Sequence, residues 1–146
     1  MSERNKKTAQ YYIDEVWNKG NLDIMEETHA ESYMHHDPHD PWTRDHGPGA
    51  DAVKKLIRFY RTAFPDLHLT IEEIVAEGDV VVARFSSRGT HKEELAGHKA
   101  THKTVKLQGI FWWRFENGKI AEGRPYWDAH GFMRQIGAIP EMAKLF

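Results

Sequence analysis

The sequence predicts an α+β domain in which N-terminal helices pack on a curved antiparallel β-sheet. Apolar residues recur at helical spacing in the first 64 residues and alternate with polar residues beyond that point. The Asn117-Gly118 pair adds the strongest short-range hairpin signal in the chain. Helices followed by an antiparallel run of strands are typical of α+β domains. The chain has 146 residues, so we expect one domain over residues 1–146.

Two longer helices and a short one between them are expected in the first half. The first helix has an apolar stripe formed by Ala9, Tyr12, Ile13, Val16 and Trp17. A short second helix, which Asn21 can cap, carries Leu22 and Met25. A third helix is expected over about residues 50–64, because the apolar stripe returns there and Pro65 ends it.

Four strands are expected after residue 66. The first carries Leu67, Leu69 and Ile71, and a turn at residues 77–79 leads into a second, DVVVARFSS. The third and fourth span about 104–116 and 119–128, and a short helix follows over about 129–137. A curved sheet with helices across it leaves a cone with an open mouth, which can hold a small ligand.

The two hairpin turns also predict which residues face each other. A two-residue turn at Asn117-Gly118 pairs Glu116 with Lys119, and the same register places Asp128 opposite Leu107. The more apolar face of this hairpin is expected to be interior. It carries Leu107, Phe111, Trp113, Phe115, Ile120 and Tyr126, with Glu122, Arg124 and Asp128 among them. Glu122 and Arg124 are expected to form a structural ion pair, as are Glu73 and Arg84 on the earlier hairpin.

Composition excludes several classes of protein. The formal net charge of −2 gives no global electrostatic basis for nucleic-acid binding. The absence of cysteine excludes disulfides, a thiolate nucleophile and thiolate metal sites. No apolar run approaches the ~20 residues of a membrane span, and the polar N-terminus is unlike a secretory signal. We therefore expect a cytoplasmic protein with a small-molecule substrate and neither a nucleic-acid nor a membrane partner.

Three segments together resemble the SnoaL-like polyketide cyclase (ester cyclase) family of the NTF2-like superfamily. They are YYIDEVWNKGNLDIMEETHAESYMHHDP, AFPDLHLTIEEIVAEGDVVVARFSSRGTH and FENGKIAEGRPYWDAHGFMRQIGA. The resemblance covers about residues 8–138. It implies an NTF2-like cone, in agreement with the pattern of helices and strands.

The resemblance also implies a reaction and residues for it. Family members close a carbocyclic ring of a polyketide ester by intramolecular aldol condensation, with an aspartate on the last strand as general acid/base and no metal or organic cofactor. Asp128 matches that aspartate, and His36 matches a histidine that lies in the pocket of such cyclases. Residues expected to bind the substrate are Arg124, Tyr126, Phe111, Trp113 and Leu107.

Alternatives remain open at this point. Asp128 could instead cap the helix that begins at Ala129. The cone could bind a small ligand without chemistry, or the same carboxylate could serve a hydrolase or an isomerase. A polar pair deep in the pocket favours an enzyme, whereas Asp128 locked in a helix cap favours a binder. A homodimer through the outer sheet face is expected, because Trp112, Ile110 and Trp127 point outward in the predicted register.

Ten histidines raise the question of a metal site. The proline- and glycine-rich stretch at residues 35–49 is expected to be a long loop that holds one group of histidines and aspartates. His91, His98 and His102 lie near Glu93 and Glu94 in a second group. Imidazole and carboxylate ligands suit zinc or iron, but neither group has a firm motif spacing, so no metal site is predicted.

Overall fold

A computed structural model describes residues 1–40 and 45–140 of the chain. The described part contains helices and a five-stranded sheet with strand order β1-β5-β4-β3-β2. In chain order the elements are α1 (Ser2–Tyr12), η1 (Ile13–Trp17, π-helical), η2 (Leu22–Ile24, a 3-10 turn), α2 (Met25–Thr28), β1 (His29–His35), α3 (Asp51–Ala63), β2 (His68–Glu77), β3 (Val80–Thr90), β4 (Thr104–Glu116), β5 (Lys119–Trp127) and α4 (Ala129–Gln135). The predicted α+β class is confirmed, and the four predicted strands form an antiparallel meander.

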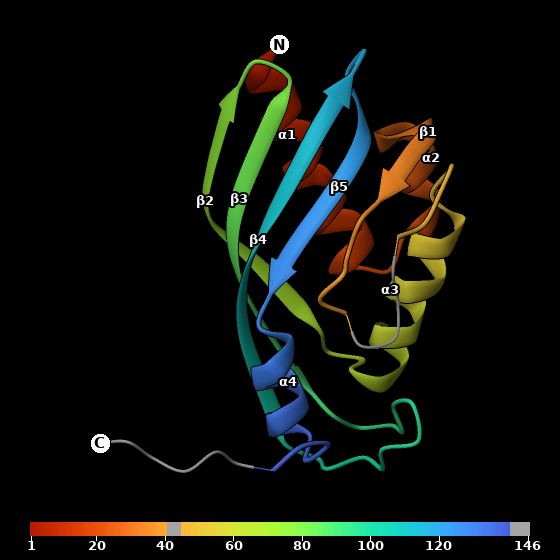
Figure 1. Ribbon diagram of the computed structural model, residues 1–146, viewed down its shortest axis with the longest axis vertical. Coiled ribbons are helices and arrows are strands. Elements are labelled where there is room, and N and C mark those ends of the chain that lie inside the picture. Colours follow the sequence, from red (N-terminus) through yellow and green to blue (C-terminus); the bar gives the residue numbers. More distant parts are fainter. Residues whose placement is uncertain (41–44, 141–146) are drawn as a thin grey trace.

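The helices cover one face of the curved sheet (Figure 1). Ala9 and Ile13 from the first helical segment and Ile57 from α3 are fully buried there, in one apolar cluster with Val81 and Ala83 of β3. Burying such side chains stabilises a fold by roughly 1.5–3 kcal/mol each for the larger ones. The opposite face of the sheet carries no helix along β2 and β3 in this view. The helical spacing of apolar residues in the sequence therefore determines which face of each helix is buried against the sheet.

One strand was not predicted from the sequence. β1 pairs in parallel with β5, where Met34 lies opposite Glu122 and His35 opposite Gly123. The chain continues with the His36 backbone N–H donating to the Gly123 carbonyl at 2.9 Å. β1 has no alternating apolar pattern, so its sequence gives no strand signal. Its position brings the start of the expected 35–49 loop against the last strand.

The predicted register of the β2–β3 hairpin is confirmed near its turn. Glu77 pairs with Val80, and Glu73 lies opposite Arg84. The Arg84 Nε donates to Glu73 Oε1 at 2.7 Å, as expected for the cross-strand ion pair. Both side chains are exposed, so the pair contributes little to stability.

The predicted register of the β4–β5 hairpin is wrong beyond its first two pairs. Glu116 pairs with Lys119 and Phe115 with Ile120, but Arg114 then pairs with Glu122. The extra residue is Ala121, a β-bulge that shifts all later pairs by one. Because strand side chains alternate, a shift of one residue exchanges the two faces. Ile120 and Ala121 are accordingly both buried, although they are consecutive.

Close packing at Gly123 fixes β5 against β1. A Cβ atom added at this position would lie 2.3 Å from the Tyr33 hydroxyl oxygen, which real contacts do not allow. Glycine is required there by the close approach of Tyr33, which is itself buried. In the described part of the chain, no helix is both long and apolar enough to cross a membrane.

Candidate active site

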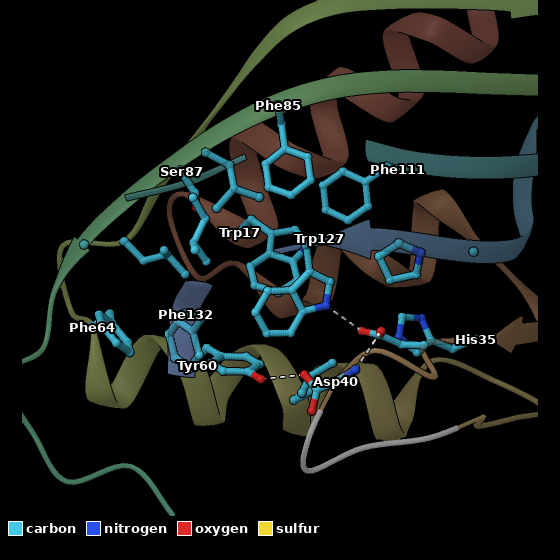
Figure 2. A pocket seen from close by; sticks show the side chains of 18 of the residues that line it. Trp17, His35, Asp40, Tyr60, Phe64, Phe85, Ser87, Phe111, Trp127 and Phe132 are labelled. Atoms are coloured by element: carbon cyan, nitrogen blue, oxygen red, sulfur yellow. Dashed lines mark hydrogen bonds between the residues drawn. The ribbon is translucent and has the colours of Figure 1, made fainter. Parts of the chain in front are cut away.

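A cavity lies between the curved sheet and the helices. It contains about 900 Å³ of empty space when its open mouth is included. Figure 2 shows Phe85 and Phe111 on the sheet side, Tyr60 on α3, and Phe64 and Phe132 at one end of the view. Phe85 and Phe111 stack with ring centroids 4.7 Å apart. Such a lining of aromatic rings suits a flat, largely apolar ligand.

Two carboxyl groups, those of Asp37 and Asp40, lie in this otherwise apolar wall. They are the only carboxyl side chains that line the cavity within the described ranges. Both residues are 2% exposed. The Trp127 Nε1 donates to Asp37 Oδ2 at 3.3 Å, and the Asp40 backbone N–H donates to Asp37 Oδ1 at 3.1 Å. Burial, and then the neighbouring Asp40 carboxylate, raise the pKa of Asp37 to about 6.

The second carboxyl is held from α3. The Tyr60 hydroxyl donates to Asp40 Oδ2 at 2.5 Å, a contact drawn as a dashed line in Figure 2. Burial and the Asp40 carboxylate together raise the pKa of Tyr60 far above its ordinary value, so its hydroxyl stays protonated as a donor. The two aspartates thus form one hydrogen-bonded unit anchored on β5 and α3.

A histidine of β1 lines the same cavity. The His35 Nδ1 lies 2.9 Å from the Tyr33 hydroxyl, and its Nε2 is buried without a hydrogen-bond partner in the described residues. Burial, and then the charge of His46, lower the pKa of His35 to about 4. His35 is therefore a neutral imidazole near pH 7, with one ring nitrogen fixed and the other unsatisfied.

Because the register of β5 is shifted, only some of the residues predicted to bind substrate face the cavity. Phe111, Trp113 and Leu107 line the cavity as predicted. The placement of Tyr126 was wrong, because its side chain is 46% exposed and lies opposite Ile110 on the outer face. Arg124 borders the cavity, but its guanidinium pairs with Glu122 at 2.8 Å and lies over the ring of Trp112 on the outer face.

Asp128 does not line the cavity. Its Oδ1 accepts a hydrogen bond from the Gly131 backbone N–H at 2.8 Å, which makes it the N-cap of α4. The predicted placement at the inner rim is therefore wrong. The bulge at Ala121 turned Trp127 inward, and Asp128 instead borders a polar groove on the outer sheet face with Arg88, Lys106 and Gln108. This position does not decide the predicted catalytic role of Asp128, which the variants described below compare with that of Asp37.

His36 also lies away from the cavity and from Asp128. Its Nε2 is 3.4 Å from Glu122 and its Nδ1 is 3.4 Å from Asp45. Burial would raise the pKa of Glu122, but hydrogen bonds from Arg114 and Arg124 outweigh it, so the pKa of Glu122 is lowered. The predicted pairing of Glu122 with Arg124 is confirmed, and it belongs to an outer-face network that includes His36. The predicted pairing of His36 with Asp128 across the mouth is not found.

The histidine groups show no metal geometry in the described part. Residues 1–40 and 45–140 contain no set of three or more His, Asp and Glu side chains placed to hold an ion. His91 is fully buried, stacks on Phe64 and receives the Thr101 backbone N–H at Nδ1. These contacts give His91 a structural role, in which it packs beneath the connector formed by residues 90–103.

A family model described as SnoaL-like polyketide cyclase matches residues 7–136 of the chain. The chain belongs to the SnoaL-like polyketide cyclase family. This is a family of enzymes, and its membership was expected from the three sequence segments quoted above. The match supports a cyclase role for the protein.

Individual members of the SnoaL-like family align with this chain over most of their length. The chain is 30% identical over 126 residues to a nogalonic acid methyl ester cyclase of Streptomyces nogalater, covering 84% of this chain and 90% of the relative. It is 28% identical to the aklanonic acid methyl ester cyclase DnrD of Streptomyces peucetius, covering 84% of each protein. Among solved structures, AclR of Streptomyces galilaeus, a putative hydroxylase, superposes with a TM-score of 0.84 at 25% identity, covering 99% of this chain and 88% of that one.

Sequence reasoning within the SnoaL-like family missed Asp37, Asp40 and His35. Two of them, His35 and Asp37, flank the selected residue His36, and Asp40 follows three residues after Asp37. The signal that could have found them is alternation: once β1 is recognised as a strand, His35 and Asp37 share one face and His36 takes the other. The short Asp37-Pro38 turn then brings Asp40 beside Asp37.

Proposed function

We propose that this protein catalyses a cofactor-free intramolecular aldol condensation that closes a ring of an aromatic polyketide ester or a similar small carbonyl compound. Family membership supports a cyclase role. The methyl ester substrates in the names of two relatives indicate the substrate class to test first. The reaction is an isomerisation, so it needs no second substrate.

The structural observation that best supports the proposal is the Asp37–Asp40 pair, which lies in a cavity lined by aromatic rings. Proton abstraction next to a carbonyl needs a base whose pKa is near the working pH. A carboxyl removed from water meets this need, because burial disfavours its charged form. The surrounding rings offer a flat apolar surface to hold a polycyclic substrate against this base.

The alternative of a non-catalytic binding module has one observation in its favour. Asp128 is locked in a helix cap, the arrangement expected of a binder. The polar pair deep in the cavity is the arrangement expected of an enzyme, and it is the stronger signal because two buried carboxyls are costly without a use. A hydrolase that uses the same pair gives a product of altered mass, and an isomerase that closes no ring gives an isomer without the new C–C bond.

The proposal is tested by incubating the purified protein, in buffer with a chelator, with nogalonic acid methyl ester. Ring closure leaves the mass unchanged and shifts the chromatographic retention and the absorbance of the product. A new isomer at a rate above the protein-free control is expected, whereas a product of altered mass or no product contradicts the cyclase.

A matched pair of variants tests the site. Ser87 lines the cavity, and Ser86, its neighbour on β3, faces outward and hydrogen-bonds Glu72. Ser87→Trp fills the cavity and is expected to abolish ring closure, and Ser86→Trp is expected to retain it. Equal activity of the two variants would place the reaction outside this cavity.

We also retain the homodimer through the outer sheet face as a proposal, with a cytoplasmic location. Val75, Val82 and Trp112 form one row across three strands of that face, and Val75 is 62% exposed. Ile110 and Tyr126 form a second exposed pair. An apolar face of this kind is typical of interfaces. A single species of monomer mass by sedimentation at micromolar concentration contradicts the dimer.

A further inference from the structure

We propose that Asp37, in the turn after β1, is the acid/base that removes and returns the proton during ring closure, and that neither a side chain of β5 nor Asp128, which follows β5, does so. This assignment rests on the proposed function, and it names a residue different from the one suggested by family resemblance.

The last strand offers the cavity no group that can exchange a proton near neutral pH. The β5 residues that face the cavity are Gly123, which has no side chain, Pro125 and Trp127. Arg124 borders the cavity with a permanently charged guanidinium that is paired with Glu122. The bulge at Ala121 determines which β5 residues face the cavity, because it exchanges the two sheet faces for all residues that follow it. A proton-transfer group in the cavity has to come from another element.

Asp37 has the surroundings of a base rather than of a structural ion. It is buried in the cavity wall, and within residues 1–40 and 45–140 its hydrogen-bond partners are the Trp127 indole and the backbone of its own turn, with no cation among them. The neighbouring Asp40 accepts a hydrogen bond at Oδ2 from the Tyr60 hydroxyl, a donor that comes from α3. The two N–H donors fix the orientation of the Asp37 carboxyl without neutralising it.

The groups that face Asp37 bear on its protonation. They are Asp40 from the same turn, Tyr33 and His35 from β1, Tyr60 from α3 and Trp127 from β5. Tyr33 and Tyr60 stay protonated because burial raises their pKa values, and His35 stays neutral because burial lowers its pKa to about 4. Asp40 is therefore the nearby charge among these groups, and its carboxylate favours the protonated form of Asp37.

The step balances with Asp37 alone. The Asp37 carboxylate takes a proton from the carbon next to a carbonyl, and the C–H electron pair becomes an enolate. The enolate carbon attacks a second carbonyl of the same molecule, which forms the C–C bond and leaves an alkoxide. The protonated Asp37 carboxyl then gives its proton to the alkoxide, so the enzyme returns to its starting state.

The test compares wild type with Asp37→Asn and Asp128→Asn, each confirmed to be folded by circular dichroism. Asparagine preserves the shape of both residues and caps a helix as well as aspartate does. With nogalonic acid methyl ester, kcat is expected to fall ~10²–10⁴-fold in Asp37→Asn and to stay within about twofold of wild type in Asp128→Asn. The rise of wild-type kcat/KM through about pH 6 is expected to disappear in Asp37→Asn. Retained activity in Asp37→Asn, or its loss in Asp128→Asn alone, overturns the assignment.

A second probe separates this assignment from the proposed function. Acetophenone has exchangeable methyl protons next to a carbonyl, and their replacement by deuterium in D₂O needs proton transfer but no ring closure. If wild type closes no ring yet exchanges these protons, and Asp37→Asn does not, the proposed function fails and the Asp37 assignment holds. If wild type shows no exchange, or Asp37→Asn exchanges at the wild-type rate, the Asp37 assignment fails.

Discussion

Replacing Asp37 by asparagine is expected to stabilise the protein at neutral and higher pH, although it removes the proposed base. Burial, and then the neighbouring Asp40, raise the pKa of Asp37 from the ordinary 3.8 to about 6 in the folded protein. Above pH 6 the folded protein must therefore hold a charge that the unfolded chain accommodates more easily. Asparagine is a neutral isostere of the protonated carboxyl, so it is free of this penalty.

The size of the effect follows from the two pKa values. They differ by about two units, and each unit is worth about 1.4 kcal/mol, so the charged carboxyl costs about 3 kcal/mol at pH 8. A group whose pKa is raised on folding contributes stability below its unfolded pKa and loses it as pH rises through the folded pKa. The advantage of the variant should thus be about 3 kcal/mol at pH 8, about half of that at pH 5, and near zero below pH 4.

The assay is urea unfolding of both proteins at pH 8, 7, 6 and 5, followed by circular dichroism. The difference in unfolding free energy between variant and wild type isolates Asp37 from all other groups that titrate in this range. Asp128→Asn, which replaces an aspartate outside the cavity, serves as the control. If Asp37→Asn is less stable than wild type at pH 8, or if the difference does not change with pH, the burial argument for Asp37 is refuted.

Three further predictions concern the fold around the site. Asp128→Ala removes the cap of α4 and should lower the unfolding free energy by about 1 kcal/mol, measured in urea, whereas an unchanged value would show that the Gly131 hydrogen bond has no net effect. Gly123→Ala places a Cβ 2.3 Å from the Tyr33 hydroxyl oxygen and should destabilise the protein by roughly 1–3 kcal/mol; a neutral result in thermal unfolding would mean that β1 moves freely against β5. Burial lowers the pKa of His29 to about 3 and that of His35 to about 4, so stability should fall as pH drops below about 6.5, by about 2 kcal/mol per histidine at pH 5, partly offset by Asp37; a wild-type urea midpoint at pH 5 equal to or above that at pH 7 would contradict this.

Most of the fold could be predicted because it depends on periodicity. The stripe of Ala9, Ile13 and Val16 and the alternation along β3 each identify a buried face without knowledge of the neighbours. The Asn117-Gly118 turn identifies its hairpin for the same local reason. β1 escaped prediction because its pairing with β5 joins segments far apart in the sequence, and no local pattern reports such a contact.

The candidate site could be predicted only in part, and a single residue explains the difference. Phe111, Trp113 and Leu107 on β4 were placed correctly, because β4 has no bulge of its own. Ala121 shifts β5 by one position, which moves Tyr126 out and Trp127 in. A small alanine next to Ile120 fits either a regular strand or a bulge, so composition cannot distinguish them.

The proposed mechanism requires one carboxyl group in the inner cavity that exchanges a proton near neutral pH. Carbon-13 NMR of wild-type protein labelled at the aspartate carboxyl carbons measures this directly, with the Asp37 signal assigned by its absence in Asp37→Asn. We expect this carbon to titrate with a pKa of about 6. A titration at or below about pH 4, the ordinary value for a solvated aspartate, would contradict it.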